Sequence, residues 1–304
     1  GAMDLVLDLA REKAADLVLA NDPDADRLAV AVRDRDGTYV MLTGNEIGCL
    51  LAHLLLTARK GASHGKGQAL VISTVVSSPM LGAIAAHHGA RWEQTLTGFK
   101  WIANRAIELS AKGEADFVFG YEEALGYCVG NLVRDKDGVS AATVMATLAA
   151  KLKREGRTLL DERETMWRTY GLFMSQQVSW VLPGSDGLTR IGAAMKTVRG
   201  RHPTHIGGLA VETVVDLGEG RRIEGGKEMA LEGPRSNVLL FGVEGGHRIM
   251  LRPSGTEPKL KFYYDVRIAA GEGEAMDDAI GRGRALLKTL AEDFRTQVEG
   301  SDAS

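Results

Sequence analysis

The sequence has few of the features that mark disulfide-linked, secreted or membrane proteins. Only two of its 304 residues are cysteine, and the spacing of Cys49 and Cys128 fits neither a disulfide framework nor a metal-binding pattern. We expect both thiols to be reduced and buried in a cytoplasmic protein. No apolar run approaches the roughly 20 residues of a membrane-spanning helix, and the first residues lack the apolar core of a signal peptide. The sequence therefore predicts neither membrane association nor secretion.

The sequence also has little excess charge of either sign, because 37 basic residues nearly balance 40 acidic ones and leave a formal net charge of −3. A balanced surface gives no general attraction to nucleic acid or anionic membranes, so we expect neither as a partner. An anionic ligand must then be recognised by a local cluster of basic groups. With 44% hydrophobic and 25% charged residues, the composition is typical of a globular protein large enough for more than one domain.

The hydrophobic pattern changes twice along the chain. Residues 1–41 begin with an amphipathic pattern, and we expect a helix at 4–15 followed by strands at 17–20, 28–32 and 39–42. In residues 42–170, short apolar runs alternate with helical patterns, which is typical of a parallel α/β sheet. This segment is expected to open with a helix capped by Asn45. Its other elements are expected as strands at 69–74, 91–96 and 117–119 and as helices at 79–88, 101–109, 140–154 and 159–169.

Residues 171–304 have the pattern of an α+β domain. Helices are expected at 187–199 and 274–298. Strands are expected at 177–181, 209–216, 238–241, 249–251 and 260–266. A glycine-rich stretch at 218–233 is assigned no element.

Three carboxylates alternate on the loop between two expected strands, at Asp22, Asp24 and Asp26, and Arg27 follows them. Hard oxygen ligands at this density suit Mg²⁺, whereas a solvated acidic turn is the alternative interpretation. An EF-hand fits poorly, because its sixth position would be Arg27 instead of glycine and its twelfth Arg33 instead of glutamate. An arginine beside a metal indicates that an anion also binds there.

Residues 252–259, Arg-Pro-Ser-Gly-Thr-Glu-Pro-Lys, lie between two strands expected near the end of the chain. They offer a guanidinium group, two hydroxyls and backbone N–H groups around a glycine, which are the parts of a phosphate site. A turn rich in serine, glycine and proline that binds nothing is equally compatible with this stretch.

Two more polar segments follow strands of the α/β segment, where ligands of parallel sheets bind. Thr97-Gly98-Phe99-Lys100 lies in an expected loop at 95–100, and a second expected loop spans Gly120–Tyr127. Glu122 in the second loop can accept hydrogen bonds from sugar hydroxyls. A glutamate exposed on a turn without function would give the same pattern.

Taken together and in this order, the four segments resemble the α-D-phosphohexomutase family of phosphoglucomutases and phosphomannomutases. Members of that family have four domains, which carry in turn a phosphoserine loop, a D-x-D-x-D-R metal loop, a sugar-contacting loop and a phosphate-binding loop. The resemblance covers essentially the whole chain. It implies that residues 1–41 are a remnant of the second domain, similar to the third, that 42–170 are the third domain, and that 171–304 are the fourth.

The resemblance also implies roles for individual residues. It implies that Mg²⁺ is bound by Asp22, Asp24 and Asp26, with Arg27 as the adjacent catalytic arginine. It implies substrate binding by Thr97, Gly98, Lys100, Glu122 and Lys136, and phosphate binding by Arg252, Ser254, Gly255, Thr256 and Lys259. The implied small molecules are a sugar phosphate as substrate and a sugar 1,6-bisphosphate as activator, and the protein could act as a monomer or a dimer.

Two features depart from the family pattern. Ala124 stands where many members have serine. The segment Gly120–Tyr127, together with residues 134–138, is instead similar to the branch of phosphopentomutase-like proteins and bacterial phosphoglucomutase/phosphomannomutases. The phosphoserine motif Thr/Ser-Ala-Ser-His-Asn-Pro is absent from the 304 residues. Ala62-Ser63-His64-Gly65 imitates it, but this stretch follows the acidic segment and lacks Asn-Pro, so Ser63 is not the expected nucleophile.

The function implied by the resemblance is a mutase that interconverts sugar 1-phosphates and 6-phosphates through a phosphoserine and a bisphosphate intermediate. Without the serine, we expect these 304 residues to be inactive alone, as part of a longer parent enzyme. A phosphopentomutase, a sugar-bisphosphate synthase and a non-catalytic sugar-phosphate-binding module are alternatives. A metal-dependent phosphatase is disfavoured, because the acidic segment is not followed by the threonine of the haloacid-dehalogenase nucleophile motif.

Overall fold

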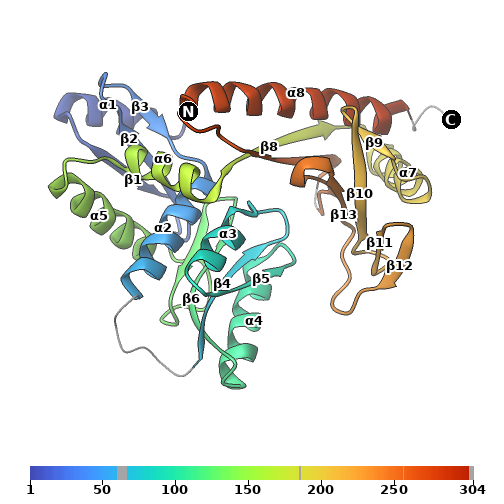
Figure 1. Ribbon diagram of the computed structural model, residues 1–304, viewed down its shortest axis with the longest axis horizontal. Coiled ribbons are helices and arrows are strands. Elements are labelled where there is room, and N and C mark those ends of the chain that lie inside the picture. The colour runs from blue at the N-terminus through green and yellow to red at the C-terminus, as the bar shows by residue number, and fades with distance from the viewer. Residues whose placement is uncertain (60–66, 185, 256, 301–304) are drawn as a thin grey trace. The chain divides into compact units, whose positions relative to one another are not determined.

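A computed structural model describes residues 1–59, 67–184, 186–255 and 257–300 (Figure 1). The chain divides into two compact units, Gly1–Tyr170 and Gly171–Ser304, here called unit 1 and unit 2. Each unit is described by itself. None of the described helices is both long enough and apolar enough to cross a membrane.

Unit 1 begins with a helix on a small antiparallel sheet. The helix is α1 (Asp4–Lys13), and the sheet order is β1 (Leu17–Asn21), β2 (Leu28–Arg33), β3 (Tyr39–Met41). Ala10 of the helix packs with Val18 and Ala31 of the sheet. Asn21 at the end of β1 pairs with Leu28 at the start of β2, which leaves residues 22–27, here called the acidic loop, as the connection between the two strands.

The rest of unit 1 is an α/β domain around a four-stranded sheet of order β5-β4-β6-β7. The strands β4 (Gln68–Thr74), β5 (Arg91–Thr95) and β6 (Ala115–Glu122) are parallel, and β7 (Gly126–Val129) runs antiparallel to β6. The helices are α2 (Gly44–Arg59), α3 (Met80–His87), α4 (Phe99–Ala111), α5 (Gly138–Arg154) and α6 (Leu159–Tyr170). The alternating pattern thus correctly predicts a parallel α/β sheet.

The N-terminus of α2 differs from the prediction, because Thr43 and Glu46 cap this helix. The hydroxyl of Thr43 accepts a hydrogen bond from the Glu46 N–H at 3.3 Å, and the Glu46 carboxylate accepts one from the Thr43 N–H at 2.8 Å. This reciprocal pair is a capping box. Asn45 was expected as the cap, but its side-chain oxygen instead accepts hydrogen bonds from the Ser78 N–H and the Tyr121 hydroxyl.

The expected loop at 120–127 is mostly a β-hairpin. Strand β6 continues to Glu122 and β7 starts at Gly126, so only residues 123–125 remain as a turn. Tyr121 and Tyr127 are fully buried and stack with ring centroids 6.5 Å apart, and this packing keeps both residues within the sheet. Leu125 closes the turn with a positive φ of 67°.

Unit 2 is an antiparallel sheet with helices, as expected for the α+β segment. The sheet order is β12 (Lys227–Ala230), β11 (Arg221–Glu224), β10 (Leu209–Asp216), β13 (Leu239–Val243), β14 (His247–Pro253), β15 (Lys259–Ile268), β8 (Leu172–Val181). A two-residue strand, β9 (His205–Ile206), also pairs with β10. The helices are α7 (Gly187–Gly200) and α8 (Met276–Gly300), with a short 3₁₀ turn at Glu244–Gly246.

Helix α8 lies along the sheet of unit 2 (Figure 1) and buries apolar side chains there. Phe294 is buried, and its ring meets the rings of Phe241 and Phe262 edge-on at centroid distances of 5.4 and 5.8 Å. The glycine-rich stretch contains the β11–β12 hairpin, which the sequence did not reveal. Every residue of β12 is exposed, so the strand carries no apolar alternation from which it could be predicted.

Candidate active site

The acidic loop brings its three carboxylates together. One oxygen of each of Asp22, Asp24 and Asp26 lies within 4.8 Å of the other two. The ends of the loop are held by the β1–β2 pairing and by a 2.7 Å hydrogen bond from the Asn21 side-chain amide to the Arg27 carbonyl. The alternating carboxylates that the sequence suggested as a metal site therefore do converge on one point.

The charges on this loop are only partly balanced by protein groups. The backbone N–H of Arg27 donates to Asp22 at 3.0 Å, and the guanidinium donates to the same carboxylate at 2.5 Å, which together lower the pKa of Asp22. One oxygen of Asp26 lies 3.2 Å from the Lys136 ammonium. Its other oxygen is buried and has no hydrogen-bond partner among the described residues, with the Arg27 Nε 3.5 Å away.

A divalent cation fits this donor set. Three carboxylates supply hard oxygen atoms of the kind that Mg²⁺ prefers, and a buried oxygen without a hydrogen bond is costly unless something binds it. The loop residues thus meet the chemical requirement for a Mg²⁺ site.

The second predicted segment lies at the carboxyl ends of β5 and β6. Glu122 is only 9% exposed, and its carboxylate accepts a 2.6 Å hydrogen bond from the Gly98 N–H. Gly98 has a φ of 118°, which only glycine adopts without strain. The Thr97 hydroxyl is buried and has no hydrogen-bond partner within the described ranges. Thr97, Gly98 and Glu122 therefore form one polar cluster at the ends of these two strands.

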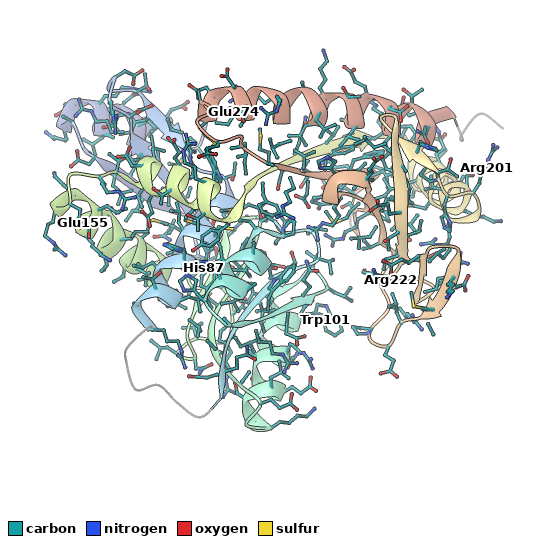
Figure 2. The ribbon with its side chains drawn as sticks, in the orientation of Figure 1. His87, Trp101, Glu155, Arg201, Arg222 and Glu274 are labelled. Carbon is teal, nitrogen blue, oxygen red and sulfur yellow. The ribbon has the colours of Figure 1, made fainter. Side chains whose placement is uncertain are left out.

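Lys100 lies apart from that cluster. It belongs to the first turn of α4 and not to the expected loop, because the helix begins at Phe99. Its ammonium lies 5.3 Å from the ring centroid of Trp101, which Figure 2 labels. Among the described residues its ammonium makes no hydrogen bond or ion pair with Glu122, so the structure brings Thr97 and Gly98 together with Glu122 but leaves Lys100 on the helix surface.

The acidic loop and the β6–β7 hairpin are joined through the backbone. Arg27 and Gly126 form an isolated antiparallel bridge, and the Leu28 N–H donates to the Leu125 carbonyl at 3.1 Å. On the other side of the loop, the Gly138 N–H donates to the Ala25 carbonyl at 3.1 Å. The acidic loop and the strand pair that carries Glu122 are therefore parts of one connected structure.

Lys136 reaches across this junction. Its ammonium pairs with Asp26 and with Asp135, each at 3.2 Å, and lies 5.6 Å from the ring centroid of Phe99. A side chain on Gly126 would come within 2.5 Å of the lysine stem, so the glycine provides the path by which the lysine reaches Asp26. Lys136 was predicted to bind substrate, and in this structure its partners are carboxylates of the protein.

Sequence reasoning missed a third strand end in the same region. Thr74, the last residue of β4, and Ser77 after it are completely buried. Both hydroxyls donate to the Glu123 carboxyl, at 3.3 and 3.2 Å. The rule that ligands bind beyond the carboxyl ends of parallel strands, applied to the central strand, would have pointed to this loop.

In unit 2, residues 252–259 connect β14 to β15. The Ser254 N–H donates to the Lys259 carbonyl at 2.8 Å, and the Lys259 ammonium pairs with Glu257 at 2.9 Å. Arg252 lies directly opposite Lys261 across the strand pair. Gly255 stands near the tip with open space around its Cα, and Thr256 is outside the described residues.

The pairing of Arg252 with Lys261 is electrostatically unfavourable by itself. Like charges directly opposite each other on a sheet are destabilising. Neither side chain has an ion-pair partner in the part of unit 2 that the structure describes. Two cations beside a serine and a glycine at a hairpin end leave positive charge that an anion would neutralise.

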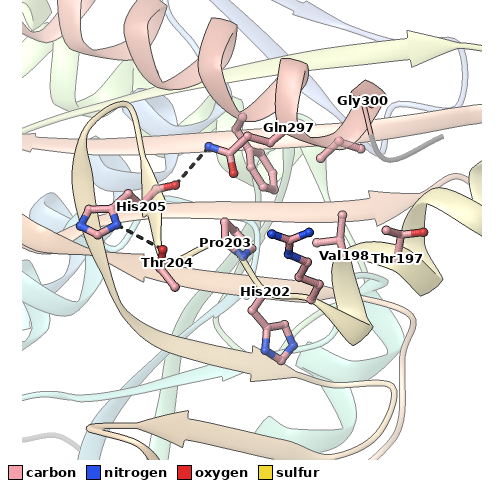
Figure 3. Close-up of a pocket in the computed structure, with 11 residues that line it drawn as sticks. Thr197, Val198, His202, Pro203, Thr204, His205, Gln297 and Gly300 are labelled. Atoms are coloured by element: carbon pink, nitrogen blue, oxygen red, sulfur yellow. Dashed lines mark hydrogen bonds between the residues drawn. The ribbon is translucent and has the colours of Figure 1, made fainter. Parts of the chain in front are cut away.

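A hollow elsewhere in unit 2 is a separate feature. A pocket of about 480 Å³ lies where α7 and α8 end, and Figure 3 shows Gln297 donating to the His205 carbonyl at its rim. None of the residues that line it belongs to the 252–259 hairpin. The predicted phosphate residues therefore do not lie in this hollow.

Comparison with known proteins identifies the family. Residues 43–170 match the family model described as phosphoglucomutase/phosphomannomutase, alpha/beta/alpha domain III. A relative from Haemophilus influenzae named probable phosphomannomutase is 41% identical over 268 residues, covering 88% of this chain and 49% of the relative. The chain belongs to the α-D-phosphohexomutase family. It spans about half the length of the curated relatives it matches.

Other members of the family have names that state different activities. A phosphoglucomutase from Staphylococcus epidermidis is 36% identical and covers 86% of this chain and 47% of the relative. A probable phosphoribomutase from Schizosaccharomyces pombe is 34% identical and covers 99% of this chain and 51% of the relative. The solved structure of parafusin from Paramecium has a TM-score of 0.64 at 19% identity, covering 99% of this chain and 48% of parafusin, which supports the phosphohexomutase fold.

Proposed function

We propose that these 304 residues are the metal-, sugar- and phosphate-binding part of a phosphohexomutase that interconverts sugar 1-phosphates and 6-phosphates. The observation that carries the proposal is the junction in unit 1. There the backbone bridge from Arg27 to Gly126 links the acidic loop to the strand pair that bears Glu122. A cation site and a hydroxyl-binding carboxylate held in one structure match the needs of a sugar phosphate, which presents both phosphoryl oxygens and ring hydroxyls.

Each group then has a distinct task. Asp22, Asp24 and Asp26 would hold Mg²⁺, which when bound neutralises negative charge on phosphoryl oxygens. Arg27 would orient a phosphoryl group beside the loop. Glu122, with Thr97 and Gly98, would bind ring hydroxyls in either orientation of the sugar.

Unit 2 would bind the phosphate that does not react. In this proposal Arg252, Ser254, Gly255, Thr256 and Lys259 contact its oxygens. The guanidinium supplies a charge-assisted hydrogen bond worth roughly 1.5–3 kcal/mol. Lys100 and Lys136 would also bind the substrate.

The phosphoryl carrier is not among the recognisable motifs of this sequence. Ser63, the only imitation of the phosphoserine motif, lies outside the described residues. We propose that these residues alone do not turn over a sugar phosphate, and that a sugar 1,6-bisphosphate serves the complete enzyme as intermediate and activator. A pentose phosphate is the second candidate substrate, because a relative matched over 99% of this chain is named a phosphoribomutase.

Calorimetry with glucose 1-phosphate and ribose 1-phosphate, each with Mg²⁺, tests the proposal. We expect weak binding of at least one of them, competed by inorganic phosphate. Arg252→Ala should weaken binding more than Glu122→Ala, because phosphate recognition dominates. Arg222→Ala, which removes an exposed arginine paired with Glu224, is the matched control and should change nothing.

Three results would contradict the proposal. If the unaltered chain binds neither sugar phosphate, the proposed function is wrong. A larger loss from Glu122→Ala than from Arg252→Ala refutes the dominance of phosphate. Turnover of glucose 1-phosphate in a coupled assay, abolished by Ser63→Ala, would show that the phosphoryl carrier lies within these residues.

A further inference from the structure

Glu123 is a buried acid beside the proposed site that the proposed function does not use. It is the first residue of the three-residue turn between β6 and β7, next to Glu122. Its carboxyl accepts hydrogen bonds from the Thr74 and Ser77 hydroxyls at 3.3 and 3.2 Å, and its own N–H donates to the Ser77 hydroxyl at 3.2 Å. Three hydrogen bonds thus tie the turn to the end of the central strand β4.

The surroundings of this carboxyl favour its uncharged form. Thr74 and Ser77 are 0% exposed, their hydroxyl oxygens lie 2.7 Å apart, and no arginine, lysine or histidine pairs with Glu123 in the described part of unit 1. Burial raises the pKa of Glu123, and the nearby charge of Glu122 adds to the effect. A protonated carboxyl can remain here as a hydrogen-bonding group without a counter-ion.

The other side of the same turn holds the acidic loop. Leu125, two residues after Glu123, accepts the backbone hydrogen bond from Leu28, and Gly126 bridges to Arg27. The start of α2 closes a third side, where a side chain on Gly44 would come within 2.0 Å of the Glu123 carbonyl oxygen. The turn is therefore fixed between the end of β4, the start of α2 and the acidic loop.

We propose that Glu123 is a positioning residue, whose hydrogen bonds to Thr74 and Ser77 set the turn that aligns both Glu122 and the acidic loop. Among the described residues its carboxyl bonds to Thr74 and Ser77 and to none of the three aspartates. Its effect passes through the backbone to Leu28 and Arg27 on one side and to Glu122 on the other. The effect on sugar phosphate rests on the proposed function, whereas the effect on the acidic loop does not.

A merely structural acid would behave differently. Its loss would lower stability but leave the Mg²⁺ affinity of the folded protein unchanged, because the hydrogen bonds of its carboxyl go to Thr74 and Ser77 and not to the acidic loop. A positioning role predicts that the folded Glu123→Ala variant binds Mg²⁺ and glucose 1-phosphate about fivefold more weakly, the scale of one lost hydrogen bond. Glu123→Gln, which keeps an uncharged hydrogen-bonding group, should restore both affinities to near the original values.

The experiment compares the full 304-residue chain with Glu123→Ala, Glu123→Gln and the control Glu114→Ala. Glu114 precedes β6 at the far end of the same strand, is exposed, and pairs with Arg91 at 3.3 Å. Mg²⁺ titrations followed by NMR give the affinity, and hydrogen exchange at the Leu28 and Gly98 amides reports the two linked contacts without any ligand. Ser77→Ala, which removes the partner hydroxyl, replaces Glu123→Ala if the latter does not fold.

We expect faster exchange at both amides and weaker Mg²⁺ binding in Glu123→Ala or Ser77→Ala, and no change in Glu114→Ala. Unchanged exchange and affinity in a folded Glu123→Ala or Ser77→Ala protein would overturn the proposal, as would a Glu123→Gln variant as impaired as alanine. If the unaltered chain binds Mg²⁺ but no sugar phosphate, the proposed function fails while the Mg²⁺ and exchange results still decide the role of Glu123. If it binds no Mg²⁺, exchange alone decides it.

Discussion

Replacing Lys136 with methionine should strengthen Mg²⁺ binding at the acidic loop. The lysine ammonium lies 3.2 Å from Asp26, and both side chains are about one quarter exposed, at 24% and 29%. A cation bound to the same carboxylate would be repelled by this ammonium and would have to compete with it. Methionine keeps an unbranched stem to cover Gly126 and Phe99 but carries no charge.

The size of the effect follows from Coulomb's law. A divalent ion on Asp26 would lie on the order of 5 Å from the ammonium, which gives a repulsion of about 1.7 kcal/mol in the dielectric of water. Salt at about 0.15 M screens roughly half of this over that distance. About 0.9 kcal/mol remains, which corresponds to a roughly fivefold tighter Mg²⁺ dissociation constant for Lys136→Met.

Isothermal titration of Mg²⁺ into the unaltered chain, Lys136→Met and Lys112→Met measures this difference. Lys112 pairs with Glu108 beside the C-terminus of α4, so its replacement removes the same charge without touching the acidic loop. We expect tighter binding only in Lys136→Met, with a gap that narrows as salt is raised. An unchanged or weaker affinity in Lys136→Met would refute the idea that this lysine competes with the metal.

Three further predictions concern stability. Thr43→Ala removes the cap of α2 and should lower the free energy of unfolding by about 1 kcal/mol in urea denaturation, whereas no loss would mean that the cap is dispensable. Asp265→Ala removes the buried carboxylate that Arg248 and Ser175 both contact at 2.6 Å, and should cost about 3 kcal/mol; a cost under about 1 kcal/mol contradicts this. Because the pKa of Glu123 is raised in the folded protein, its stabilising effect is full below the ordinary value of about 4.3 and declines as pH rises. The free energy of unfolding, measured between pH 4 and 8, should therefore fall with rising pH in the unaltered chain relative to Glu123→Gln. If the difference between the two free energies does not change with pH, the raised pKa of Glu123 is excluded.

The sequence predicted the convergence of the three carboxylates of the acidic loop better than the surroundings of the loop. Alternating carboxylates between two apolar strands leave few alternatives, so Asp22, Asp24 and Asp26 could be expected to converge. The position of Lys136 could not be predicted, because it depends on the absence of a side chain at Gly126 and on a turn that was expected to be a loop. Long-range contacts of this kind leave no local pattern in the sequence.

Local signals also competed with one another. Asn45 and Thr43 are both good caps, and only the reciprocal contact with Glu46 decides for Thr43. That signal, a threonine three residues before a glutamate, was readable from the sequence. The β6–β7 hairpin was harder to predict, because polar Glu122 and Glu123 interrupt the apolar run and the two tyrosines reveal their burial only in the folded sheet.

The contact between Gly138 and the acidic loop sets an order of events during synthesis. A side chain at this glycine would come within 2.4 Å of the Arg27 carbonyl oxygen, so the start of α5 lies directly against the loop. About 110 residues separate the two positions in the sequence. At 5–20 residues per second, a ribosome needs roughly 5–20 s to make them. The carboxylates are thus translated well before the start of α5, which packs against their loop. A nascent chain should therefore acquire its native affinity for Mg²⁺ only after α5 has emerged.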